Sequence, residues 1–179
     1  MRNPDSSGCR SRGKEMDGIN EGELEAYRVE ITQVLRDSIS PYLRCGSSGD
    51  VADMFSFMST FDTERLIVVC VDTKLRVSAY STVSIGTLTA SIVHPREVFK
   101  VAILSNSSGI IVVHNHPSGD PGPSDEDSRI TERIAEAGNI MGIPLLDHVI
   151  IGDGSHHSFA DAGDIGFPDY SMSRGMVLR

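Results

Sequence analysis

The chain contains 179 residues, and with 39% hydrophobic residues it is long enough for one domain with a single core. Its formal net charge of -9 gives no general attraction to polyphosphate, so the composition does not support a dedicated nucleic-acid binder. No apolar run approaches the ~18 residues of a membrane helix, and the N-terminus has no apolar segment of a secretion signal.

The cysteines indicate a reducing compartment. Cys9, Cys45 and Cys70 are an odd number at no metal-like spacing, which is typical of reduced thiols rather than a disulfide scaffold. Cys70 lies inside the apolar run "LIVVCV" and is predicted to be a core residue, since a catalytic thiolate needs an electropositive setting. We therefore expect a cytoplasmic protein without membrane contact.

The N-terminal third is predicted to be a lead-in to the main domain. Residues 1–20 are polar and rich in Gly, Ser and Arg, a composition typical of a flexible tail. Residues 21–60 are predicted to be helical: apolar residues recur at helical spacing to about residue 38, and "DVADMFSFM" forms a second short helix after a Gly-rich break.

Strands and helices then alternate through the main domain, which we place at residues 61–163. The β-branched run "RLIVVCVDT" and the segment "VSAYSTVSIGTLTASIV" predict two or three strands. A helix follows in "HPREVFKVAILSN", with Pro95 at its start. "GIIVV" is a buried strand, "SDEDSRITERIAEAGNIMG" an amphipathic helix ended by Gly142, and "IPLLDHVIIGDG" a further strand. Residues 164–179 show little period and are predicted to be a tail.

The stretch "HNHPSGDPGPSDED" carries the chemistry. Residues i and i+2 of a strand point to the same face, so His114 and His116 project together, and Pro117 ends the strand directly afterwards. Two neutral imidazoles and a third ligand make a Zn²⁺ site that leaves one position for water. Asp127, in the first turn of the next helix, is the candidate third ligand.

A plainer explanation exists for the same residues. Ser124 and Asp127 fit a capping box with Asp in place of the usual Glu. A pair of histidines can also lie on a surface or in a core without binding a ligand. Capping does not explain two histidines at a strand terminus, and both roles can coexist. From spacing alone, the metal site and the structural interpretation remain open.

The segment also fits the pattern H-x-H-x7-S-x2-D through His114, His116, Ser124 and Asp127. This pattern resembles the JAMM signature of JAB/MPN metallopeptidases, and roughly residues 50–163 resemble the RadC branch of that superfamily. The resemblance implies an α/β fold of the JAB/MPN type. That fold has three layers: a curved mixed or mostly antiparallel sheet with helices on both sides.

The resemblance further implies an upstream glutamate at the start of the first long strand. Glu64, before "RLIVVCVD", fills this position; Glu97 of "HPREVF" is the rival, but its place in a first helical turn favours a capping or dipole role. Glu64 would then act as general acid and base, and Ser124 would donate a hydrogen bond to the oxyanion. The expected function is a zinc-dependent peptidase or isopeptidase acting on a protein or peptide substrate.

Two other functions stay open. RadC-like proteins carry a DNA-repair label, and a role in repair or mobile elements would bring nucleic acid as a partner. Longer members have an N-terminal helix-hairpin-helix region that this sequence nearly lacks, and this weakens direct DNA binding. An inactive MPN interaction scaffold is the third alternative, although such modules usually lack the ligands. The sequence does not fix the oligomeric state.

Some residues outside the motif have weaker signals. Asp147 and His148 of "LLDHVIIG" belong to the RadC-like pattern, and they either support the metal ligands or form a structural buried pair. His156 and His157 lie beside a Gly turn and are predicted to be exposed.

Overall fold

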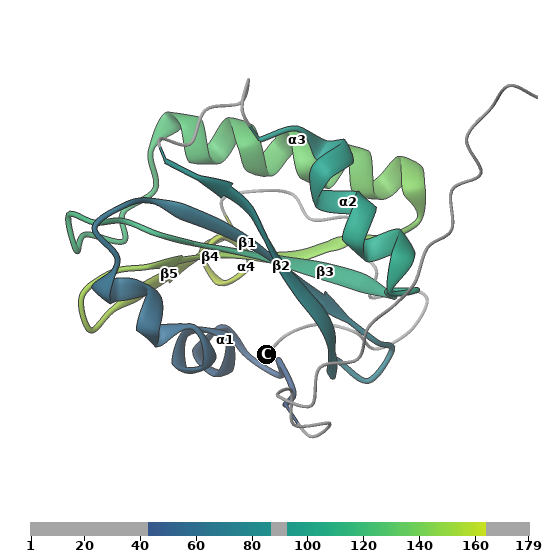
Figure 1. The fold of residues 1–179 in the computed structure, drawn as a ribbon, viewed down its shortest axis with the longest axis horizontal. Coiled ribbons are helices and arrows are strands. Elements are labelled where there is room, and N and C mark those ends of the chain that lie inside the picture. Colours follow the sequence, from purple (N-terminus) through teal and green to yellow (C-terminus); the bar gives the residue numbers. More distant parts are fainter. Residues whose placement is uncertain (1–42, 87–92, 164–179) are drawn as a thin grey trace, which may run out of the picture. The chain divides into compact units, whose positions relative to one another are not determined.

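The computed structural model describes residues 43–86 and 93–163. The helix predicted before residue 38, the tail of residues 1–20 and that of residues 164–179 lie outside the described residues. In the described part, the sheet is the middle of three layers (Figure 1): α2 (Pro95–Leu104) and α3 (Asp125–Met141) cover one face, and α1 (Ser48–Met54) lies against the other. The predicted α/β fold, with helices on both sides of the sheet, is confirmed.

The sheet is mixed, as the resemblance implied. Its described strands run in the order β2-β1-β3-β4-β5, and among them β3 and β4 form the single parallel pair. A parallel pair needs a crossover, which here passes through α3. The strands are β1 (Arg65–Val71), β2 (Val77–Ile85), β3 (Gly109–Asn115), β4 (Leu145–Ile151) and β5 (His156–Ser158).

The helix ends follow the local sequence signals. Pro95 occupies the first turn of α2, and Gly142 ends α3 with φ 69°, a left-handed conformation that glycine adopts without a steric penalty. A short helix α4 (Phe159–Ala162) follows β5. Across residues 43–86 and 93–163, the helices are all too short or too polar to cross a bilayer.

The segment "DVADMFSFM" differs from the single short helix predicted. Phe55 leaves helical geometry with φ -107° and ψ 14°, which ends α1, and a 3-10 helix, η2 (Ser56–Thr60), follows. Residues three apart lie on the same side of a 3-10 turn, so Phe55 and Met58 both bury against the sheet.

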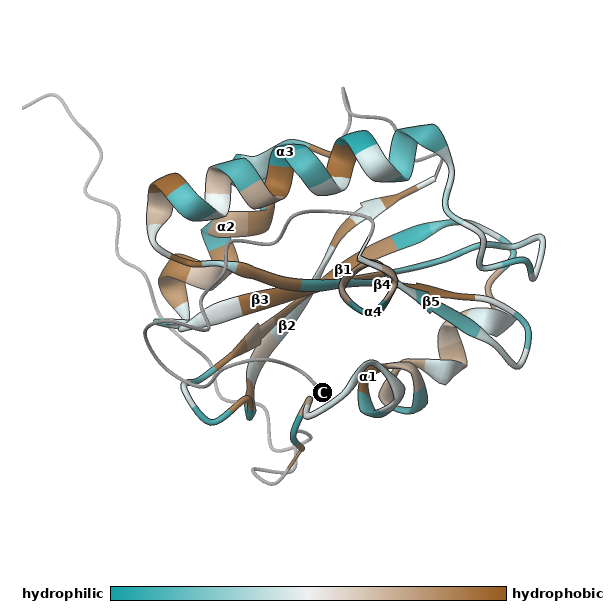
Figure 2. Cartoon of the chain, turned by 180° about the vertical axis from the view of Figure 1, so that it is seen from behind, coloured by the Kyte–Doolittle hydropathy of each residue, from teal (hydrophilic) through white to brown (hydrophobic). Residues whose placement is uncertain are grey.

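Strand alternation in β3 decides where its histidine points. Ile110 and Val112 pack with α2 and α3, whereas Ile111 and Val113 pack with the α1 side. His114 continues the first set, so its ring lies under α3 rather than under α1. Figure 2 shows mostly hydrophobic residues along β3 and a mixture of hydrophilic and hydrophobic residues along α3.

Cys70 lies fully buried in the α3-side core, and this confirms its predicted place; Cys45 is also fully buried. Burial, with a smaller effect of Asp50, raises the pKa of Cys45 to about 11, and burial also raises the pKa of Cys70.

Because the thiolate is the nucleophile, we expect both thiols to react with iodoacetamide at pH 8 at least ~100-fold more slowly in the native than in the denatured protein. Peptide mass spectrometry of timed samples measures this, and rapid native labelling of Cys70 would contradict it.

Candidate metal centre

Three ligand atoms from two elements meet at the end of β3. His114 and His116 come from this end and Asp127 from the first turn of α3, and one ligand atom from each residue lies within 4.8 Å of the others. His114 Nε2 is 3.0 Å from His116 Nε2 and 3.2 Å from Asp127 Oδ1, and His116 Nε2 is 3.4 Å from Asp127 Oδ2. The three residues that the sequence predicted as ligands are thus brought together.

The loop between β3 and α3 is held against the end of β4. The backbone N–H of His116 donates to the Ile151 carbonyl (3.0 Å), and that of Asp153 donates to the Gly119 carbonyl (2.8 Å). Gly152 makes this approach possible, since a Cβ there would lie 2.4 Å from the Gly119 oxygen. The same loop therefore fixes His116 and delivers the N-terminus of α3 to the site.

The electrostatics of the cluster favour a bound cation. Burial raises the pKa of Asp127, but contacts with His114 and His116 outweigh it and hold the pKa well below its usual range. Burial lowers the pKa of His114, and contact with Asp127 only partly opposes this. The interaction with Asp127 raises the pKa of His116, with burial opposing. At neutral pH the site therefore presents an ionised carboxylate beside a neutral, buried imidazole.

The hydrogen bonding of His116 directs a lone pair into the cluster. Its Nδ1 lies 2.7 Å from the Asp120 carbonyl oxygen, which can only accept, so Nδ1 carries the hydrogen. In the neutral ring, Nε2 then carries the lone pair that can bind a metal, and this atom faces Asp127. Two imidazole nitrogens and one carboxylate oxygen are a donor set that fits Zn²⁺ better than Ca²⁺ or Mg²⁺.

Ser124 and Asp127 form the predicted capping box at the start of α3. The Ser124 hydroxyl donates to Asp127 Oδ2 (2.6 Å) and accepts from the Asp127 N–H (3.2 Å), while the Ser124 N–H donates to Oδ2 (2.8 Å). The box orients the Asp127 carboxylate toward the histidines. Because the Ser124 hydrogen is used in this bond, the role of Ser124 toward an oxyanion stays a prediction.

The two candidate glutamates lie in different places. The pKa of His114 is lowered mainly by burial and that of His116 is raised mainly by Asp127, and the charge of Glu64 is a smaller effect that raises both. Glu97 lies in the first turn of α2 and pairs with Lys100 and Arg96. The hydrogen bond from Lys100 lowers the pKa of Glu97. The assignment of Glu64 rather than Glu97 as general acid and base stays a prediction.

Asn115, the residue between the two histidines, holds the backbone around Glu64. Its side chain points to the opposite face, where Oδ1 accepts from the Arg65 N–H (2.9 Å) and Nδ2 donates to the Thr63 carbonyl (3.3 Å). The Glu64 carbonyl itself accepts from Gly86 N–H (2.9 Å). Strand alternation predicts only the direction of the Asn115 side chain, because its partners are about 50 residues away in the sequence.

The weaker candidates Asp147 and His148 divide into two roles. Asp147 is buried and accepts hydrogen bonds from Ser158 Oγ and from the backbone of His148 and Ala160, which fixes the start of α4. Burial, against these bonds, raises the pKa of Asp147 to about 6. His148 Nε2 lies 2.7 Å from His114 Nδ1, so His148 contacts the group of candidate ligands through the ring nitrogen of His114 that faces away from Asp127.

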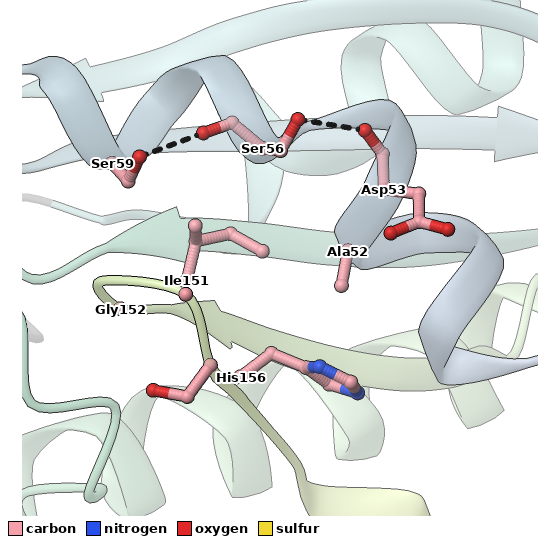
Figure 3. Close-up of a pocket in the computed structure, with 9 residues that line it drawn as sticks. Ala52, Asp53, Ser56, Ser59, Ile151, Gly152 and His156 are labelled. Carbon is pink, nitrogen blue, oxygen red and sulfur yellow. Dashed lines mark hydrogen bonds between the residues drawn. The ribbon is translucent and has the colours of Figure 1, made fainter.

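A separate pocket of about 250 Å³ lies between the α1–η2 segment and the β4–β5 turn (Figure 3). The Ser56 hydroxyl donates to the Asp53 carbonyl of α1, and the Ser59 hydroxyl donates to the Ser56 carbonyl within η2. None of the cluster residues lines this pocket, and its helical wall belongs to the opposite side of the sheet from α3. His156, which lines it, is exposed as predicted, whereas His157 is half-buried.

In this α/β fold, a mixed sheet presents two histidines at a strand end to the first turn of a crossover helix, as in a JAB-type domain. The RadC-like JAB domain matches residues 45–164, and the chain belongs to this family. It is 50% identical over 119 residues to a UPF0758 protein of Methanosarcina acetivorans, covering 66% of this chain and 52% of that protein.

Two further relatives have a similar degree of identity to the chain. Identity to a UPF0758 protein of Thermotoga maritima is 50% over 108 residues, covering 60% of this chain and 49% of that protein. Identity to a UPF0758 protein of Caldanaerobacter subterraneus is 56% over 106 residues, covering 59% and 46%. The chain thus spans about half the length of the curated relatives it matches.

Proposed function

We propose that the protein is a zinc-dependent metallohydrolase that cleaves an amide bond, peptide or isopeptide, in a protein substrate. The observation that carries the proposal is the convergence of His114, His116 and Asp127 within 4.8 Å. The charge of Glu64, which adds a small upward effect on the pKa of both histidines, supports a place for Glu64 beside them. The JAMM pattern of the same residues supports this reaction class.

His114, His116 and Asp127 would hold Zn²⁺, which would supply Lewis acidity and lower the pKa of a water toward ~7. The protein residues do the rest. Glu64 accepts a proton from the attacking water as the new carbon–oxygen bond forms, and returns a proton to the amine as the carbon–nitrogen bond breaks. Ser124 donates a hydrogen bond to the oxyanion in this proposal, which requires its hydroxyl to turn away from Asp127.

Access to the cluster comes from the His116 side. The His116 side chain is 14% exposed, whereas His114 is fully buried and Asp127 nearly so. A substrate therefore approaches over the loop of residues 117–123 and the N-terminus of α3.

The test is a substrate panel with controlled metal content. Zinc-loaded protein, chelator-treated protein and the same sample with zinc restored are incubated with peptides and with lysine-linked isopeptides. We expect cleavage that disappears with the chelator and returns with zinc. Zinc-loaded protein that cleaves nothing in the panel, yet retains DNA with a steep salt dependence, would instead favour the nucleic-acid alternative.

A further inference from the structure

A buried chain of hydrogen-bonding groups lies behind the metal cluster. His114 Nδ1 is 2.7 Å from His148 Nε2, and His148 Nδ1 is 2.5 Å from the Thr131 hydroxyl oxygen. That hydroxyl in turn donates to the backbone carbonyl of Asp127, 2.5 Å away. All four residues are buried, and the chain connects two of the candidate ligands through residues that the sequence pattern of the site does not include.

The terminal carbonyl sets the direction of every hydrogen in this chain. A carbonyl oxygen only accepts, so Thr131 donates to it, and the Thr131 oxygen accepts from His148 Nδ1. A neutral, buried His148 with its hydrogen on Nδ1 has a lone pair on Nε2, which accepts from His114 Nδ1. His114 then keeps a lone pair on Nε2, the atom that faces Asp127 and His116.

We propose that Thr131 and His148 are positioning residues that hold His114 in its metal-binding tautomer, with the hydrogen on Nδ1 and the Nε2 lone pair directed at the metal position. Both candidate histidine ligands are then fixed in the same way. His116 donates from Nδ1 to the Asp120 carbonyl directly, and His114 reaches the Asp127 carbonyl through His148 and Thr131. The inference deepens the proposed metal function and rests on it.

The Thr131 hydroxyl determines which tautomer His114 adopts, as the alternative with every hydrogen bond of the chain reversed shows. In that arrangement Thr131 donates to His148 Nδ1, His148 donates to His114 Nδ1, and His114 carries its hydrogen on Nε2, where Asp127 Oδ1 at 3.2 Å attracts it. The Thr131 and Asp127 oxygens would then face each other at 2.5 Å with no hydrogen between them, which is repulsive. Without the hydroxyl this penalty disappears, and the carboxylate favours the tautomer that blocks the metal.

The His148 ring is held in the plane that this geometry requires. Phe159 stacks on it with 5.0 Å between ring centroids and an interplanar angle of 11°, and Phe159 is itself fully buried at the start of α4. The bonds from Ser158 and Ala160 to Asp147 anchor this turn. The buried Asp147 therefore acts on the site through α4 and the orientation of His148.

The test compares Thr131→Val, which removes the hydroxyl at nearly constant volume, with Thr131→Ser, which keeps it. Long-range ¹H–¹⁵N NMR of the metal-free proteins near pH 8 reports which ring nitrogen of His114 carries the hydrogen. We expect the Nδ1-H tautomer in the wild type and in Thr131→Ser, and a shift toward Nε2-H in Thr131→Val. A wild-type His114 protonated on Nε2, or a Thr131→Val protein with an unchanged tautomer, would overturn the inference.

Zinc affinity provides the second measurement, by competition with a chromogenic chelator. We expect Thr131→Val to bind zinc 10- to 100-fold more weakly than the wild type, and Thr131→Ser to stay within about 3-fold of it. Equal affinities of Thr131→Val and wild type would also overturn the inference. A wild type that binds no zinc would remove the proposed function, while the NMR result would still decide the tautomer separately.

Discussion

Purified wild-type protein is expected to bind about one Zn²⁺ per chain, and His114→Ala to bind it more than ~100-fold more weakly. Loss of an outer hydrogen-bond partner of a ligand typically costs 10- to 100-fold in metal affinity, so loss of one of three ligands costs more. The remaining carboxylate and imidazole also lose their fixed geometry, because His114 is the fully buried member of the cluster. Metal analysis after dialysis, with competition titration for the affinity, measures both quantities.

His156→Ala is the matched control for this experiment. His156 is an exposed histidine that lines the separate pocket on the α1 side, so its removal is expected to leave the zinc content unchanged. Circular dichroism of both variants separates loss of metal from loss of fold. Stoichiometric zinc that survives in His114→Ala or in His116→Ala, or a wild type that stays metal-free in zinc-containing buffer, would contradict the assignment.

The zinc affinity should also depend on pH through His116. The interaction with Asp127 raises the pKa of this histidine, so in the metal-free protein His116 stays protonated to a higher pH than an ordinary imidazole. Zinc must displace that proton, and its affinity therefore falls as the pH falls through the raised pKa. His114, whose pKa is lowered by burial, is already neutral in this range and contributes little to the dependence.

The local part of the site could be predicted from the sequence because it follows from short-range geometry. Strand alternation places His114 and His116 on one face, and the capping box places the Asp127 carboxylate at the first turn of a helix. The parallel crossover from β3 through α3 to β4 then leaves little choice about where that turn lies. The three candidate ligands could therefore be predicted without knowing any contact between residues distant in the sequence.

The supporting residues depend on strand register, which no local pattern reveals. Val112 of β3 pairs with His148 of β4, and Leu66 of β1 pairs with His114. These two pairings bring His148 behind His114 and bring Glu64 to the end of β3 where Asn115 holds its backbone. A shift of one residue would turn His148 to the α1 side, so the register is needed to decide between the supporting role and the structural role that the sequence left open for it. Glu64 itself was reached through the family resemblance rather than through spacing.

The catalytic prediction concerns Glu64→Gln, in which hydrolysis is expected to fall by 10²- to 10⁴-fold while zinc remains bound. The amide of glutamine keeps the size of the side chain but cannot accept a proton from water, and proton transfer of this kind typically contributes that factor. None of the three ligand residues is changed, so zinc content should equal that of the wild type. Gly86 holds the Glu64 carbonyl and Asn115 holds the backbone of the two flanking residues, so the backbone position of residue 64 should persist in the variant.

Glu97→Gln is the control that distinguishes the two glutamates. Glu97 belongs to the α2 surface with Lys100 and Arg96, and no cluster residue contacts it in the ion pairs that the described residues form. Its change is therefore expected to leave both zinc content and cleavage at wild-type values. The three proteins are compared for metal content, for the rate of peptide or isopeptide cleavage at equal zinc loading, and for thermal stability. Unchanged cleavage in Glu64→Gln would end the catalytic assignment of Glu64, and a large loss in Glu97→Gln with retained fold would transfer that assignment to α2.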